Sequence, residues 1–126
     1  MRIIVIDDNH DVLEALVAIL QAAGHEVGHA TSAARAIEMQ SSRPAEVVIT
    51  DIFMPEVDGL EAIAALRARW PAVKIVAISG GGDRIRGGHY LDTARHAGAD
   101  AVLSKPFEPQ VLLDLLAGMA TPAGRT

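Results

Sequence analysis

The sequence predicts an α/β fold, a doubly wound parallel sheet with helices on both faces. Strand-like and helix-like segments alternate along the whole chain of 126 residues. Half of the residues are hydrophobic but only 3% are aromatic, so the core must consist of aliphatic residues, which suits buried parallel strands. The length fits one domain, and strict alternation of five strand–helix units favours helices on both sides of one sheet.

The first half of the chain predicts three strands and two helices. The aliphatic run 3–6 is a first strand, and apolar residues at helical spacing over 13–23 predict a helix that stops at the following glycine. Residues 26–30 form a weaker strand. A serine at the start of 32–40 predicts a capped helix, and the run 47–49 predicts a third strand that ends at a Thr-Asp pair.

The second half predicts two more strands and three more helices. Apolar spacing over 60–66 indicates a helix, closed by a Trp-Pro pair, and residues 74–78 form a fourth strand. A glycine-rich loop leads to a helix over 90–97, stopped by a glycine. Residues 101–103 are a fifth strand, and apolar spacing over 111–116 marks the last helix.

Composition narrows the class of protein. The chain has no cysteine, which excludes disulfides and thiolate metal sites, and its net charge of −5 argues against direct binding of nucleic acid. The N-terminal apolar run is too short for a signal peptide or a membrane span, so we expect a cytoplasmic protein. The five histidines lack zinc-ligand spacing. We expect one domain over 1–119, a frayed tail over 120–126 and no output domain.

Chemically active residues follow four of the predicted strands. Asp7 and Asp8 follow the first strand, Asp51 the third, Ser79 the fourth and Lys105 the fifth. Ligands of such sheets bind outside the carboxyl ends of the strands, so we expect these side chains to converge. Clustered carboxylates repel each other, and a divalent cation relieves that repulsion. With the lysine and the hydroxyl, they predict a site for a phosphoryl group and Mg²⁺.

Simpler interpretations exist for each residue taken alone. Asp7, Asp8 or Asn9 are suitable caps for the first helix. Asp51 and Ser79 would then be strand-end residues, and the lysine would lie on the surface. The coincidence of all of them at strand ends favours the phosphoryl site over these readings.

In this order and spacing, the motifs closely resemble the receiver domain of two-component response regulators, over Met1 to about Met119. The motifs that carry the resemblance are Ile6-Asp7-Asp8-Asn9, Thr50-Asp51-Ile52-Phe53-Met54-Pro55, Asp58-Gly59, Ala77-Ile78-Ser79-Gly80, Gly98-Ala99-Asp100-Ala101 and Lys105-Pro106-Phe107. The resemblance implies a flavodoxin-like strand order, 2-1-3-4-5, as in single-domain chemotaxis-type regulators.

The resemblance also implies the roles of the acidic residues. Asp51 would be the nucleophile and phosphoacceptor, attacking a phosphohistidine on a sensor histidine kinase or a histidine phosphotransferase. Asp8 and Asp51 would ligate Mg²⁺ directly, together with the backbone carbonyl of Phe53. Asp7 would take part in metal binding through water.

Three further positions receive roles by the same resemblance. Ser79 would bind the phosphoryl oxygens and follow them on switching, and Lys105 would pair with them. The peptide bond before Pro106 would be cis. We expect the output to be a changed protein–protein surface formed by the fourth helix, the fifth strand and the fifth helix, recognised by a downstream protein target.

Two features depart from the family pattern. The family usually has an aromatic residue three positions before the lysine, where this chain has Val102. Tyr90, the only tyrosine, is a candidate substitute, although an ordinary helix-surface role is the simpler interpretation. The segment between Ser79 and Lys105 is also longer than usual and rich in glycine, which suits a hinge or a flexible loop.

The sequence therefore predicts a stand-alone receiver that is not an enzyme in the usual sense, although it assists its own phosphorylation and hydrolysis. A phosphorelay intermediate or phosphate sink remains an alternative, as does a pseudo-receiver that binds without being phosphorylated. A haloacid-dehalogenase-like phosphatase is disfavoured, since Phe53 stands where its acid/base aspartate would be.

Overall fold

The computed structural model describes residues 1–52, 59–79, 97–105 and 107–120. Their strands are β1 (Arg2–Ile6), β2 (Glu26–Ala30), β3 (Val47–Asp51), β4 (Lys74–Ser79) and β5 (Ala101–Ser104). Their helices are α1 (His10–Ala22), α2 (Ala33–Ser42), α3 (Gly59–Arg69) and α5 (Pro109–Ala120). The predicted helix over 90–97 lies, apart from its last residue, outside the described residues.

The five strands form one parallel sheet of order β2-β1-β3-β4-β5. This confirms the predicted doubly wound α/β fold and its strand order. β1 lies between β2 and β3, so the chain reverses its direction of winding there. Each strand is as long as predicted or one to two residues longer: β1 begins one residue earlier, and β3, β4 and β5 continue into the polar residues that end them.

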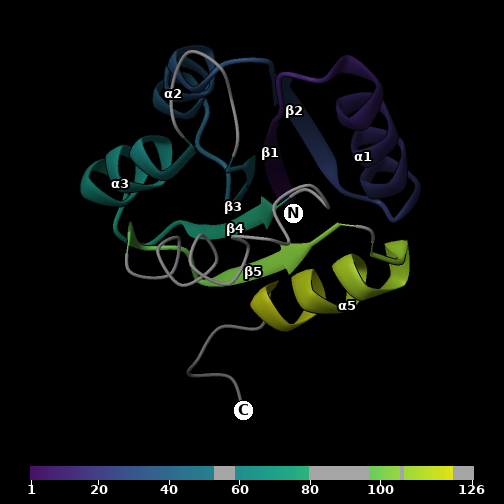
Figure 1. Cartoon of the computed structure of the whole chain (residues 1–126). Helices are drawn as coiled ribbons and strands as arrows, with labels where there is room; N and C mark the ends of the chain where they lie inside the picture. The colour runs from purple at the N-terminus through teal and green to yellow at the C-terminus, as the bar shows by residue number, and fades with distance from the viewer. Residues whose placement is uncertain (53–58, 80–96, 106, 121–126) are drawn as a thin grey trace.

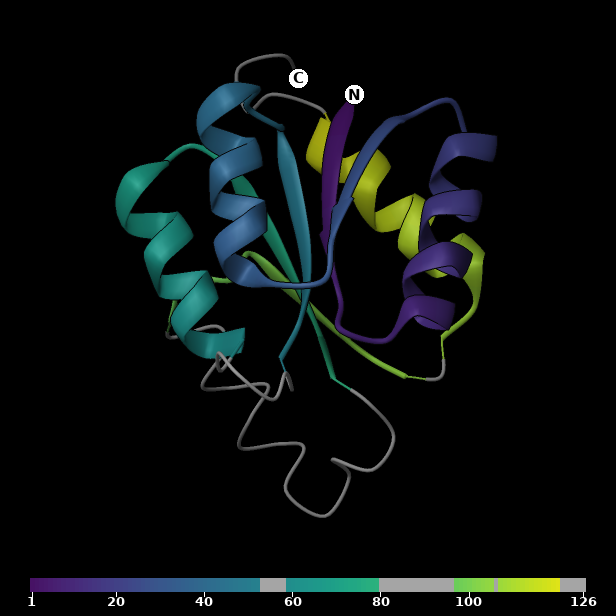
Figure 2. The same ribbon diagram turned by 90° about the horizontal axis from the view of Figure 1, so that it is seen from above.

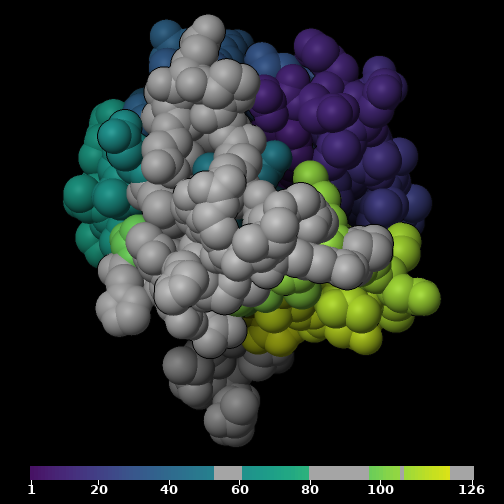
Figure 3. Space-filling view, viewed as in Figure 1, coloured from purple at the N-terminus to yellow at the C-terminus, as the bar shows by residue number. Residues whose placement is uncertain are grey.

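Helices cover both faces of the sheet, α1 and α5 on one side and α2 and α3 on the other (Figure 1, Figure 2). Two aliphatic clusters fill the two layers. One contains Leu16 of α1 and Leu112 of α5, and the other contains Ala36 of α2 and Ile63 of α3. In the space-filling view, the indigo atoms of α1 and the yellow-green atoms of α5 occupy neighbouring parts of the right-hand side of the surface (Figure 3).

The helix ends explain how the chain turns at the sheet. Asn9 caps α1, since its side chain accepts a hydrogen bond from the Val12 N–H, and Ser32 caps α2 in the same manner. Gly24 has φ of 93°, the left-handed conformation that a glycine adopts readily after a helix. The predicted cap at Ser32 and the predicted stop at Gly24 are confirmed, and of the three candidate caps for α1 the structure shows Asn9. Among the described residues, no helix is long and apolar enough to cross a bilayer.

Candidate functional site

The carboxyl ends of the strands bring the predicted side chains to one edge of the sheet. Asp7 follows β1, Asp51 is the last residue of β3, Ser79 is the last residue of β4, and Lys105 follows β5. Because β1, β3, β4 and β5 are neighbours in register, these residues lie at adjacent strand ends. This end of the sheet includes the point between β1 and β3 where the winding direction reverses, which is the usual ligand position in such sheets.

Three carboxylates form the centre of this site. One oxygen from each of Asp7, Asp8 and Asp51 lies within 4.8 Å of the others, and such a cluster could hold a metal ion. At an effective dielectric of about 20, two unit charges at that distance repel by about 3.5 kcal/mol. The oxygen-only donor set fits a hard divalent cation, which prefers carboxylate ligands.

The two adjacent aspartates differ in their surroundings. The side chain of Asp7 is only 2% exposed, and its Oδ1 accepts a hydrogen bond from the Asn9 N–H at 2.9 Å. Asp8 is exposed. The cap of α1 is Asn9, so neither aspartate serves as the cap that the simpler interpretation allowed. Asp7 is thus held in place by the turn, whereas Asp8 faces solvent beside it.

Lys105 supplies the positive charge of the site. Its Nζ lies 3.6 Å from Asp7 Oδ2 and 4.0 Å from Asp51 Oδ2. The side chain is one-quarter exposed, whereas that of Asp51 is 12% exposed. The Lys105 ammonium therefore offsets part of the negative charge of Asp7 and Asp51. It also lies close enough to Asp51 to contact a group bound to that carboxylate.

Ser79 is almost completely buried, at 2% exposed. Its carbonyl accepts a hydrogen bond from the Lys105 N–H at 2.7 Å, which extends the ladder between β4 and β5 by one step. The hydroxyl residue and the lysine of the predicted site are therefore joined through the backbone.

Several predicted positions lie outside the described residues: Phe53, with its backbone carbonyl, Tyr90, Pro106 and the glycines between 80 and 88. Val102 is described, and its half-buried side chain packs against the core cluster on the α2 and α3 side of the sheet. The strand-five position that is usually aromatic is therefore occupied here by a small core residue.

Sequence reasoning missed one polar centre close to β5. The guanidinium of Arg67 on α3 donates to the carbonyls of Pro71, Val73 and Gly98 and pairs with Asp100 at 2.6 Å. The same Asp100 oxygen also accepts from the Ile75 N–H of β4. These partners lie up to 33 residues away, so no local motif announces them. The Gly98-Ala99-Asp100 motif was the only available signal.

Comparison with known proteins agrees with this geometry. The family model of the response regulator receiver domain matches residues 3–117. PrrA of Mycobacterium tuberculosis, a transcriptional regulatory protein, is 36% identical over 92% of the chain, which spans only 47% of that protein. The response regulator receiver protein CpdR of Brucella abortus is 32% identical over 97% of the chain and 98% of its own length.

A solved structure shows the same fold. The receiver domain of NtrX from Brucella abortus superposes with a TM-score of 0.85 at 28% identity, covering 93% of this chain and 96% of that one. The family match extends over the strands that carry all four acidic and basic site residues and over the serine between them. The chain belongs to the receiver-domain family of two-component response regulators.

Proposed function

We propose that this chain accepts a phosphoryl group on Asp51 from a phosphohistidine of a sensor histidine kinase or a histidine phosphotransferase, with Mg²⁺ as cofactor. The observation that carries the proposal is the cluster of Asp7, Asp8 and Asp51 within 4.8 Å of one another, with Lys105 at 4.0 Å from Asp51. A fold does not gather these charges for stability, because carboxylates at this distance repel each other.

The reaction requires one bond to form and one to break. A carboxylate oxygen of Asp51 attacks phosphorus, the P–N bond to the partner's imidazole breaks, and the imidazole leaves with the electron pair and takes up a proton. Asp8 and Asp51 would hold Mg²⁺, which would supply positive charge next to the phosphoryl oxygens. Asp7, fixed by the Asn9 N–H, would take part in metal binding through water, and Lys105 would pair with a phosphoryl oxygen.

The chain acts as a switch rather than as a turnover enzyme in this proposal. The aspartyl phosphate adds about −1.5 to −2 charges and three acceptor oxygens at the sheet edge. The Ser79 hydroxyl then hydrogen-bonds to the new anion, and the population shifts toward the conformer that a downstream protein binds. Slow attack by water releases phosphate and restores the Asp51 carboxylate.

The experiment uses acetyl phosphate as phosphodonor and intact-protein mass as the readout. With Mg²⁺, the protein should gain one phosphoryl group, and chelation of the metal should prevent the gain. Asp51→Asn should remain unmodified, whereas Asp11→Asn, a matched change on the exposed surface of α1, should be modified normally. Modification of Asp51→Asn would mean that the nucleophile is another residue.

Phosphorylation experiments also distinguish two alternative functions of this chain. A protein that binds Mg²⁺ but takes up no phosphoryl group from acetyl phosphate or a phosphorylated kinase would be a pseudo-receiver. Transfer of the group from Asp51 to a histidine phosphotransferase domain would indicate a phosphorelay intermediate or a phosphate sink.

A further inference from the structure

β2 forms one edge of the sheet that the described residues build, and two of its five residues direct their peptide groups away from that sheet. The N–H of Glu26 bonds to Met1 and the carbonyl of Ala30 accepts from Asp7, so the even-numbered residues of β2 face β1. In a parallel ladder, both peptide groups of a residue point to the same side, and successive residues alternate. The N–H and C=O groups of Val27 and His29 therefore face outward.

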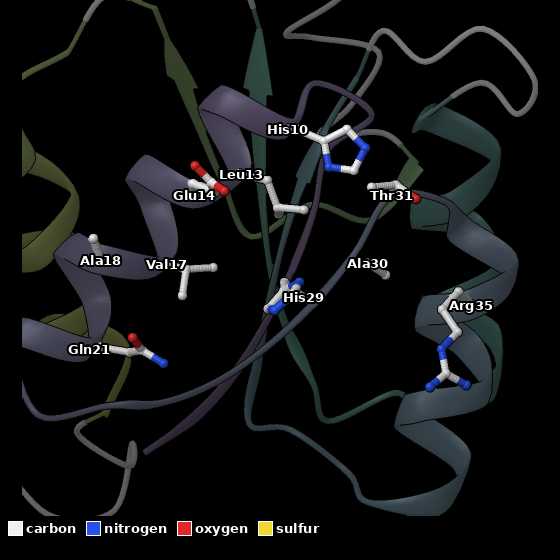
Figure 4. A pocket seen from close by; sticks show the side chains of 10 residues that line it. All are labelled: His10, Leu13, Glu14, Val17, Ala18, Gln21, His29, Ala30, Thr31 and Arg35. Atoms are coloured by element: carbon white, nitrogen blue, oxygen red, sulfur yellow. The ribbon is translucent and has the colours of Figure 1, made fainter.

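A cavity of about 440 Å³ lies directly beside this edge. Its apolar wall comes from α1, through Leu13, Val17 and Ala18, and its other wall comes from His29 and the residues that follow β2. Figure 4 shows these side chains around the hollow between α1 and the strand. The open edge therefore adjoins a hollow with room for side chains on the α1 face.

The opposite face of the edge is already covered. A Cβ at Gly28 would lie 2.8 Å from the terminal methyl group of Met39 on α2, so the methionine packs over the glycine on this face of β2. The edge therefore has an open hollow on one face and an apolar cover on the other.

We propose that the β2 edge binds an extended segment of another protein, which adds as a sixth strand. The incoming segment would exchange hydrogen bonds with the outward peptide groups of Val27 and His29, and its alternate side chains would enter the cavity over Leu13 and Val17. Strand addition of this kind takes its affinity from main-chain bonds and its specificity from pockets for alternate side chains.

A second copy of this chain fits the edge poorly. Paired strands lie about 4.7–4.9 Å apart, whereas packed helices need about 8–10 Å between their axes. α1 and α2 each pack on both β1 and β2, close to the edge. Two copies paired through β2 would therefore press α1 against α1 and α2 against α2. A segment without helices of its own avoids this conflict.

The charges around the cavity define the segment further. The Arg35 guanidinium and the imidazoles of His10 and His29, which can donate hydrogen bonds to an anion, line it together with one carboxylate from Glu14. Arg35 also pairs with Glu38 at 3.3 Å, but both of those side chains are exposed, and such pairs contribute little. The segment expected here carries an apolar side chain for the cavity and an acidic side chain toward the carboxyl end of β2.

The test is selection of a phage-displayed random dodecapeptide library on the wild-type protein, followed by calorimetry with the selected peptide. His29→Pro removes the outward N–H donor while leaving the ladder to β1, since proline is tolerated on edge strands. It should weaken binding about tenfold, the effect of one lost backbone bond with an unsatisfied partner. His29→Thr, which keeps the N–H, should bind within about threefold of wild type on the same scale.

Ala18→Arg gives an independent variant at an exposed position of α1, and it should block the cavity even if His29→Pro folds poorly. Amide exchange should show new protection at Val27 and His29 when the peptide is bound. The proposal would be overturned if the library yielded no binder, or if His29→Pro and Ala18→Arg both bound the selected peptide as tightly as the wild type does. Dimerisation of the wild type that His29→Pro abolishes would assign the edge to a second copy instead, and would also overturn it.

Discussion

Neutralising Asp8 should stabilise the metal-free protein and at the same time remove its response to Mg²⁺. Asp8 is the exposed member of the carboxylate cluster, and within the described chain it receives no hydrogen bond or ion pair. Its charge therefore repels those of Asp7 and Asp51 without a compensating contact. The Asp8→Asn variant keeps the shape of the side chain and removes only that charge.

The magnitude follows from the distances. Two unit charges 4.8 Å apart repel by about 3.5 kcal/mol at an effective dielectric near 20. Solvent around Asp8, and the Lys105 ammonium beside its neighbours, reduce the gain to about 1 kcal/mol. For a chain of 126 residues, that corresponds to about 4 °C in melting temperature. Mg²⁺ at a hundredfold excess over its Kd should stabilise the wild type by about 2.7 kcal/mol, or about 10 °C.

The assay is thermal unfolding followed by circular dichroism, in chelator and in excess Mg²⁺. Asp8→Asn should melt higher than wild type in chelator and lose most of the Mg²⁺ shift. Asp11→Asn is the matched control. It also removes one carboxylate charge, from the first turn of α1 outside the cluster, and should keep the full increase in melting temperature with Mg²⁺. If Asp8→Asn melts lower than wild type in chelator, or keeps the wild-type Mg²⁺ shift, the electrostatic reasoning about the cluster is wrong.

Three further predictions concern other positions. Lys105→Met should lower the free energy of unfolding by about 1–3 kcal/mol in urea titrations without metal, because the buried Asp7 carboxylate loses its ion pair with a lysine that is 25% exposed. Mg²⁺ should restore part of this loss, and an unchanged urea midpoint would refute the reasoning. Gly98→Ala should cost about 1–3 kcal/mol, since φ is 126° and a Cβ would lie 3.1 Å from Arg67; full wild-type stability in the same titration would contradict the strain. Burial, and then the N-terminal ammonium, lower the pKa of His25 in the folded protein below its ordinary 6.5. The neutral imidazole therefore stabilises the fold fully above pH 6.5, and this stabilisation is lost as the pH falls through the folded pKa. An NMR titration that gives a pKa of 6.5 or higher for His25 would exclude this.

The central strands β1, β3 and β4 were predictable because each is an aliphatic run buried on both faces, as Ile3–Ile6 shows, whereas β2 is a less apolar edge strand and gave a weaker signal. Convergence of Asp7, Asp51 and Lys105 was predictable as well, because parallel strands bring their carboxyl ends to one edge. The difference between Asp7 and Asp8 was not, since it depends on which side of the turn after β1 each side chain occupies.

The role of Arg67 was also beyond sequence reasoning. Two of its carbonyl partners, Pro71 and Val73, lie in the connection between α3 and β4, and the third, Gly98, precedes β5, so only the closed fold places all of them around one guanidinium. From the sequence, an arginine in the last turn of an amphipathic helix is expected to lie on the surface. The neighbouring residues do not show that Gly98 and Asp100 will come close to it. Long-range polar contacts of this kind need the three-dimensional arrangement.

The contacts of Arg67 with Gly98 and Asp100 affect how the connection between β4 and β5 can vary in length. The connection from β4 to β5 is fastened at both of its ends, at Ser79 by the Lys105 N–H and at Asp100 by Arg67 and the Ile75 N–H. Residues can then be inserted between these two anchors without moving the register of β5 or the position of Lys105. Since the closure entropy of a loop grows slowly with its length, such insertions cost little. Evolution can therefore vary the span after Ser79 while the acidic side chains and Lys105 at the carboxyl ends of the strands stay in place.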